Sequence, residues 1–123
     1  MSEPSSPILD RAVLAALRDS VGGDDGFVAD LVETYLADGA GQLAAIEAAV
    51  ASDDAPALVR PAHTLKSASY TVGAMRLGDL ARSLEQHGRG GEAGLEGARA
   101  EASAARVEWD AAEAALRSWM DRA

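Results

Sequence analysis

The fold is decided by a segment near the C-terminus, ARAEASAARVEWDAAEAALRSWM (residues 98–120). Its apolar side chains recur at heptad-like spacing, at Ala98, Ala102, Ala105, Trp109, Ala112, Leu116 and Trp119. On a helix with 3.6 residues per turn, this spacing forms one narrow apolar stripe, as the seam of a helical bundle does. The segment therefore predicts a long helix that packs against other helices, with both tryptophans in the core.

The composition of the 123-residue chain favours helices over strands. Alanine occurs 28 times, whereas valine, isoleucine and threonine together occur 13 times and only five residues are aromatic. Alanine is the best helix former, and β-branched and aromatic residues are those that strands favour. We therefore expect an all-α domain with a core of leucine, valine and closely packed alanine.

Glycines mark the ends of the first two expected helices. A short first helix is expected from a cap at Asp10 to about Val21. A second is expected over about residues 26–51, with either a bend or a break at Gly39 and Gly41. The reason is that glycine weakens a helix by about 1 kcal/mol relative to alanine.

Two more helices are expected before the C-terminal one. The start of the third is indicated by SDDAP (residues 52–56), because an aspartate cap and an early proline are typical of a helix N-terminus. It is expected to end at Gly73, with a kink or a loosened turn at Pro61. A fourth helix follows, with an apolar stripe of Leu77, Leu80, Ala81 and Leu84 and with His87 at its end, and five glycines within residues 88–97 predict a mobile loop.

Four long helices joined by short links predict an up-down-up-down four-helix bundle with a short additional N-terminal helix. One domain is expected over residues 9–122, after a flexible tail over residues 1–8 that is rich in proline and serine. A closed bundle with one exposed functional face is expected to be a monomer.

Charge and residue usage exclude several classes of function. The chain has 11 Lys and Arg against 20 Asp and Glu, a formal net charge of −9, which disfavours nucleic acid and anionic membrane surfaces as partners. It has no cysteine and only two histidines, so neither a disulfide nor a metal or cofactor site is expected. With neither a signal-peptide profile nor a membrane-spanning apolar run, a cytoplasmic protein is expected.

His63 is the first candidate for chemistry because it lies off the apolar stripe of its helix. The positions three, four and seven residues further on are Lys66, Ser67 and Tyr70, which form an outward-facing stripe. These residues alone leave an ordinary surface histidine open. A neutral imidazole is also a good nucleophile at pH 7 and can attack a phosphoryl group on a partner. Lys66 could neutralise phosphoryl charge, and Ser67 is small enough to leave space above the ring.

The sequence HTLKSAS (residues 63–69), followed by VGA (residues 72–74) and a leucine stripe that ends at Leu84-Glu85, resembles the histidine phosphotransfer (HPt) domain. GGDDGF (residues 22–27) and Tyr35-Leu36 resemble the first loop and second helix of that family, so the likeness covers about residues 9–120. The resemblance implies a helical bundle that relays phosphoryl groups between aspartates of receiver domains in two-component systems.

The resemblance also implies roles for four residues. His63 is the phosphoacceptor, through Nε2, and Lys66 is its electrostatic partner. Glu85 falls where the family often places a polar residue that hydrogen-bonds the imidazole and fixes its tautomer; the alternative is a solvated carboxylate at a helix end. Ser67 replaces the family's usual glycine, so we expect altered partner affinity or choice without loss of function.

Other polar residues are interpreted as structural. His87 is interpreted as a C-terminal cap or a surface residue. The pairs Asp24-Asp25 and Asp53-Asp54 lie where helix N-caps are required, which favours capping over a magnesium site. The glycine-rich segment is not interpreted as a phosphate-binding loop, because no strand precedes it and no lysine follows.

The resemblance implies a phosphocarrier without ATP-dependent kinase activity of its own. A receiver-domain aspartate would phosphorylate His63, which would then phosphorylate a second receiver domain. The implied partners are receiver domains and a sensor or hybrid histidine kinase, and the magnesium would be held by the receiver domain. Two alternatives stay open: a non-catalytic helical module that sequesters a receiver domain, and the phosphoacceptor domain of a chemotaxis-type histidine kinase.

Overall fold

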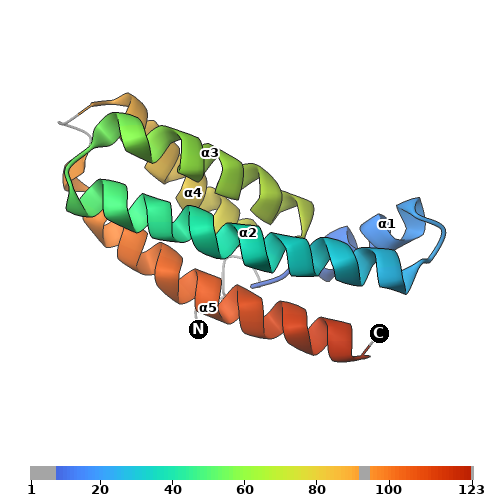
Figure 1. Cartoon of the computed structure of the whole chain (residues 1–123). Helices are drawn as coiled ribbons and strands as arrows, with labels where there is room; N and C mark the ends of the chain where they lie inside the picture. The colour runs from blue at the N-terminus through green and yellow to red at the C-terminus, as the bar shows by residue number, and fades with distance from the viewer. Residues whose placement is uncertain (1–7, 92–94, 123) are drawn as a thin grey trace, which may run out of the picture.

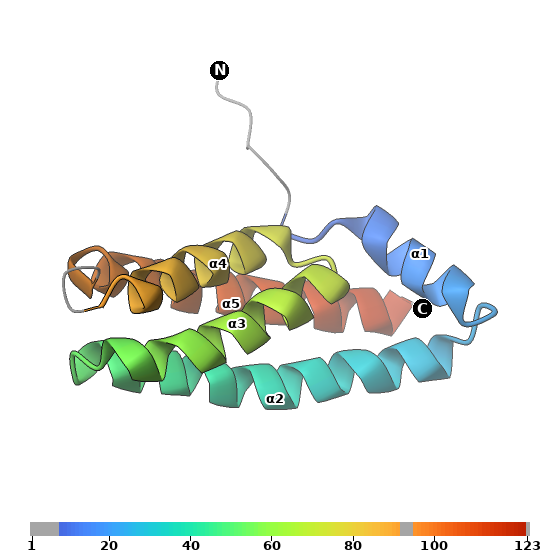
Figure 2. The same ribbon diagram turned by 90° about the horizontal axis from the view of Figure 1, so that it is seen from above.

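The computed structural model describes residues 8–91 and 95–122. Its five helices are α1 (Arg11–Ser20), α2 (Asp25–Ala51), α3 (Ala55–Thr71), α4 (Met75–Arg89) and α5 (Ala98–Arg122). Each helix from α2 to α4 packs against the next in the chain, and α5 returns beside α2 (Figure 1). The short α1 lies at the end of the bundle where α2 begins (Figure 2). The expected all-α bundle with a short N-terminal helix is thereby confirmed.

Aspartate side chains begin three of these helices, as the sequence predicts. Asp10, Asp24 and Asp54 each accept a hydrogen bond of 3.0–3.2 Å from a backbone N–H two or three residues further on. Such a bond satisfies one of the N–H groups that a helix leaves unpaired at its start. No group of three or more His, Asp or Glu side chains that could hold a metal ion occurs within the described residues.

The helix α2 runs without a break through Gly39 and Gly41, so the expected weak point does not divide it. The reason lies in packing against α5. Gly39 is buried, and a Cβ atom placed there would lie 2.6 Å from the ring of Trp109. That ring also packs against Tyr35 at a centroid distance of 5.4 Å. The missing side chain thus lets the two longest helices approach closely, and this packing offsets the low helix propensity of glycine.

The helix α3 ends close to the expected stop at Gly73, whereas α4 extends two residues into the segment that was expected to be a loop. α3 continues through the buried Pro61 to Thr71, and α4 continues to Arg89. The loop that was expected over residues 88–97 therefore begins later than predicted. Its residues 92–94 lie outside the described part of the chain. This end of α4 lies close against α3, because a Cβ atom at Gly88 would lie 3.0 Å from a backbone oxygen of α3.

The core is built from leucine, valine and alanine of all five helices. On α5 the predicted seam is buried as far as Leu116, while Trp119 is only partly buried. Within the core, the hydroxyl groups of Tyr35 and Ser69 form a 2.8 Å hydrogen bond that connects α2 to α3. Burial raises the pKa of Tyr35 to about 12, which keeps this phenol neutral. No helix in the described ranges is long and apolar enough to cross a membrane.

The contact between Gly39 and Trp109 can be tested by one added methyl group. Gly39→Ala is expected to lower the free energy of unfolding by about 1–3 kcal/mol, because the new Cβ displaces the indole ring. Gly41→Ala, on the same helix with no neighbouring atom within 4 Å, is expected to raise it by about 0.5–1 kcal/mol. Urea denaturation followed by circular dichroism measures both, and equal effects would contradict the close approach.

Candidate functional site

The imidazole of His63 lies on the outer surface of α3. Its neighbours in sequence, Ala62 and Leu65, are fully buried, and they fix the rotation of the helix. That rotation leaves 56% of the His63 side chain exposed on the side that faces α4. The structure thus places His63 on an accessible face and not in the core.

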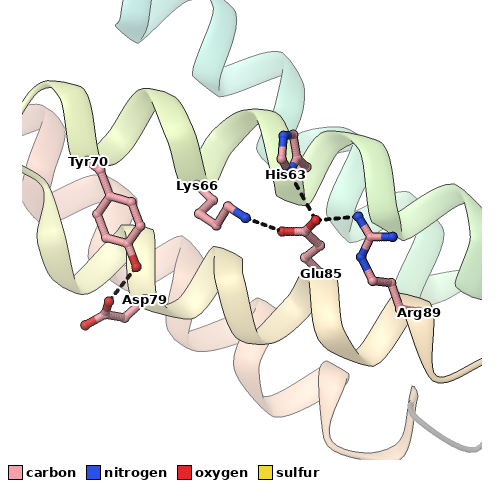
Figure 3. Close-up of polar contacts among 6 residues, drawn as sticks. All are labelled: His63, Lys66, Tyr70, Asp79, Glu85 and Arg89. Carbon is pink, nitrogen blue, oxygen red and sulfur yellow. Dashed lines mark hydrogen bonds and ion pairs between the residues drawn. The ribbon is translucent and has the colours of Figure 1, made fainter.

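Glu85 on α4 lies beside this imidazole and contacts three basic side chains (Figure 3). Its Oε2 is 3.0 Å from Nδ1 of His63 and accepts a 2.8 Å hydrogen bond from Arg89. Its Oε1 accepts a 2.7 Å hydrogen bond from Nζ of Lys66. The Glu85 side chain is only 6% exposed, so the alternative of a solvated carboxylate is wrong. A buried charge of this kind persists only when it is paired and hydrogen-bonded.

The ionised carboxylate of Glu85 determines which tautomer a neutral His63 ring adopts. The hydrogen bond from Lys66, followed by that from Arg89, lowers the pKa of Glu85 to about 2 against the opposing effect of burial. Glu85 is therefore ionised near neutral pH and can only accept hydrogen bonds. Since Nδ1 of His63 must then be the donor, a neutral ring carries its lone pair on Nε2. The ring nitrogen that is not bonded to Glu85 is the nucleophilic one.

Arg89 is the site residue that the sequence reasoning missed. It lies one turn after Glu85 on α4, at the i+4 position where opposite charges pair on a helix surface. The i, i+4 spacing of Glu85 and Arg89 could have indicated this ion pair from the sequence. Arg89, however, lay in the segment that was expected to be a loop. The Arg89 side chain is 62% exposed, and its guanidinium contacts the carboxylate from the side opposite Lys66 (Figure 3).

Two further side chains of α3 extend this surface beyond Lys66. Ser67 is exposed one turn after His63 on α3. The hydroxyl of Tyr70 donates a 2.6 Å hydrogen bond to Asp79 on α4. Its ring lies over Gly78, where an added Cβ atom would clash with the ring. Together, these groups define the His63 face, which consists of His63, Lys66, Ser67 and Tyr70 of α3 with Asp79, Glu85 and Arg89 of α4.

His87 does not belong to the His63 face. Its Nε2 lies 3.0 Å from Oε1 of Glu101, and Ser83 donates hydrogen bonds to the same carboxylate. The interpretation of His87 as a cap or surface residue is therefore incomplete, because its side chain is partly buried and joins α4 to α5. The sequence could not show this contact, since it depends on how the last helix packs.

Comparisons with known proteins agree with the resemblance. The profile of the Hpt domain family matches residues 30–122, and the chain therefore belongs to that family. The fold is similar to the crystal structure of histidine-containing phosphotransfer protein B (HptB) from Pseudomonas aeruginosa PAO1. The two structures superpose with a TM-score of 0.85, and their sequences are 29% identical. The alignment covers 97% of this chain and 99% of the HptB chain. No curated protein sequence matches the chain. The protein is thus an Hpt phosphotransfer protein of two-component signalling, in a family of phosphocarriers that are not ATP-dependent kinases.

The buried carboxylate predicts a specific dependence of stability on pH. The folded pKa of Glu85 lies below its ordinary value of 4.5, so its stabilising contribution is present above about pH 4.5 and is lost as the pH falls towards 2. Wild-type protein is expected to lose about 3 kcal/mol more unfolding free energy over this range than Glu85→Gln. Chemical denaturation at several pH values measures this, with Asp30→Asn as an exposed control on α2. A difference that does not change with pH would contradict the assignment.

Proposed function

We propose that the protein is a phosphorelay intermediate that carries the phosphoryl group on Nε2 of His63. Membership of the Hpt domain family supports the phosphotransfer chemistry. The observation that carries the choice of residue and atom is the exposed ring of His63, bonded through Nδ1 to the buried carboxylate of Glu85. That geometry supports attack by Nε2.

The proposed transfer is a displacement at phosphorus. The lone pair on Nε2 of His63 forms the N–P bond while the bond from phosphorus to an aspartate oxygen of the receiver domain breaks, and the aspartate leaves as its carboxylate. The ring keeps its proton on Nδ1 and so gains positive charge, which the Glu85 carboxylate stabilises at 3.0 Å. Transfer to a second receiver domain reverses these steps.

Two cations lie close enough to assist this displacement. Lys66 and Arg89 both contact Glu85, and both are long, flexible side chains near the imidazole. Phosphoryl transfer depends mainly on positioning and on neutralising the charge of the phosphoryl oxygens. In the unphosphorylated state described here, Glu85 holds both cations beside the ring. We assign them the role of turning towards the phosphoryl oxygens once the group has arrived.

The partners follow from this chemistry. A receiver domain supplies the phosphoryl group and holds the magnesium ion in its own acidic pocket, and a sensor or hybrid histidine kinase phosphorylates that receiver domain. Ser67 would lie against the docked partner, where its hydroxymethyl group adjusts affinity or partner choice. A cytoplasmic location and a monomeric state complete the proposal.

The first experiment is a transfer reaction followed by intact mass. A receiver domain is phosphorylated with acetyl phosphate and magnesium and then mixed with wild-type protein, His63→Gln or His87→Gln. We expect an acid-labile phosphoryl adduct on wild type and on His87→Gln, and none on His63→Gln. If several receiver domains give no adduct on folded wild-type protein, the proposal fails in favour of a sequestering module. An adduct retained by His63→Gln would place the phosphoacceptor elsewhere.

A second prediction concerns Lys66. Lys66→Ala is expected to slow phosphoryl transfer to His63 by roughly tenfold, because it removes a positive charge near the developing phosphoryl charge. Rapid-quench kinetics at saturating receiver domain measures this rate, and Lys66→Arg should recover part of it. Circular dichroism serves as the folding control. An unchanged transfer rate in Lys66→Ala would remove the lysine from the mechanism.

A further inference from the structure

The ring of Tyr70 fills a notch in the surface of α4. Gly78 is buried beneath this ring, and an added Cβ atom at Gly78 would clash with it. The phenol also donates a 2.6 Å hydrogen bond to Asp79, the next residue on α4 (Figure 3). One side chain of α3 is thus held by two adjacent residues of α4, through shape and through a hydrogen bond.

The hydrogen bond to Asp79 persists at neutral pH. Burial, followed by the hydrogen bond to Asp79, raises the pKa of Tyr70 above its ordinary value of 10.0, against the opposing charge of Arg82. The phenol therefore stays protonated and can donate to the carboxylate. Because a hydrogen bond to an ionised acceptor is stronger than one between neutral groups, it helps to keep the ring in the notch.

The contact at Gly78 and the contact at His63 belong to one register of the two helices. Tyr70 follows His63 by seven residues on α3, and Glu85 follows Gly78 by seven residues on α4. Seven residues are close to two helical turns, so the paired residues share a face on each helix. Since α3 and α4 run antiparallel, the two contacts lie two turns apart along the same interface (Figure 2).

The bond to His63 is the contact of Glu85 that is most sensitive to a rotation of α4. A carboxylate at about 6 Å from the helix axis moves by about 1 Å when the helix rotates by about 10°. A displacement of this size can break the 3.0 Å bond to Nδ1, since side-chain hydrogen bonds are lost beyond about 3.5 Å. Lys66 has a long, flexible side chain that can follow the carboxylate, and Arg89 moves with it on α4.

We propose that Tyr70 is a positioning residue for the phosphoacceptor, because its ring in the Gly78 notch fixes the rotation of α4 that places Glu85 at Nδ1 of His63. If the carboxylate moves away, the ring can lose its proton from Nδ1 to water and regain one on Nε2. The lone pair of Nε2 is then no longer available to attack phosphorus. The kinetic consequence rests on the proposed function, whereas the tautomer can be measured without any phosphoryl transfer.

The first test measures the tautomer of His63 by nuclear magnetic resonance at alkaline pH, where the ring is neutral. Two-bond correlations between ring protons and ¹⁵N nuclei distinguish the two tautomers, and His87→Gln identifies the signals of His63. We expect the Nδ1–H tautomer in the wild type and a shift towards a mixture of both tautomers in Tyr70→Ala. Tyr70→Phe keeps the ring in the notch, so a smaller shift is expected.

Gly78→Ala is an independent variant, because its methyl group displaces the ring of Tyr70. It is expected to shift the nitrogen signals of His63 in the wild-type background and to add no further shift in the Tyr70→Ala background. Gly41→Ala is the matched control, since it adds the same methyl group on α2 with no neighbouring atom within 4 Å. We expect it to leave the signals unchanged, and circular dichroism checks the folding of every variant.

Transfer kinetics then connect the tautomer to the reaction. At saturating phosphorylated receiver domain, Tyr70→Ala is expected to slow the phosphorylation of His63 roughly tenfold, because a reacting group that is misplaced by about 1 Å loses much of its rate. Gly41→Ala is expected to keep the wild-type rate.

The outcomes distinguish the two proposals. Unchanged nitrogen signals of His63 in folded Tyr70→Ala and Gly78→Ala, or shifted signals with an unchanged transfer rate, would overturn the positioning role and leave the phosphocarrier standing. A wild-type protein that no receiver domain phosphorylates, but whose tautomer depends on Tyr70, would overturn the proposed function and leave the control of the ring by Tyr70 standing.

Discussion

The buried carboxylate of Glu85 is the interaction on which the His63 face depends. A carboxylate with 6% of its side chain exposed is costly unless its oxygens are fully hydrogen-bonded. Here the compensation comes from His63 and Lys66 on α3 and from Arg89 on α4. The same contacts hold the two helices in register, orient the imidazole and gather positive charge beside it. The hydrogen bonds of the buried Glu85 carboxylate therefore both connect α3 to α4 and orient the His63 ring.

Close helix packing makes this arrangement possible with few large side chains. Gly39 admits the ring of Trp109 between α2 and α5, and Gly78 admits the ring of Tyr70 between α3 and α4. Gly88 lets the end of α4 approach the start of α3. Such contacts stabilise through the contact area that they bury, since dispersion and the hydrophobic effect grow with it. They also bring α4 near enough to α3 for a glutamate to reach a histidine.

Net charge proves a poor guide to the surface that functions. A formal charge of −9 disfavours a phosphate backbone as a partner of the chain as a whole. It does not describe the hairpin of α3 and α4, where cations outnumber carboxylates and where Lys66 and Arg89 share the Glu85 carboxylate with His63. Because screening limits electrostatic interactions to about 10 Å at 0.1 M salt, a docking partner responds mainly to the charges near its own contact.

The sequence by itself determined the helical class, the aspartate caps at Asp10 and within the pairs Asp24-Asp25 and Asp53-Asp54, and the family motif around His63. These features could be predicted because periodicity, capping and a motif on one helix depend on residues a few positions apart. Only the tertiary structure decided that Glu85 is buried, that Arg89 shares it, and that His87 binds Glu101 instead of ending a helix in solvent. The contacts of Glu85 with His63 and Lys66 join residues 22 and 19 positions apart on separate helices, so their formation depends on how those helices pack. The continuity of α2 at Gly39 also depends on helix packing, because the Trp109 ring that fills the space beside this glycine belongs to α5.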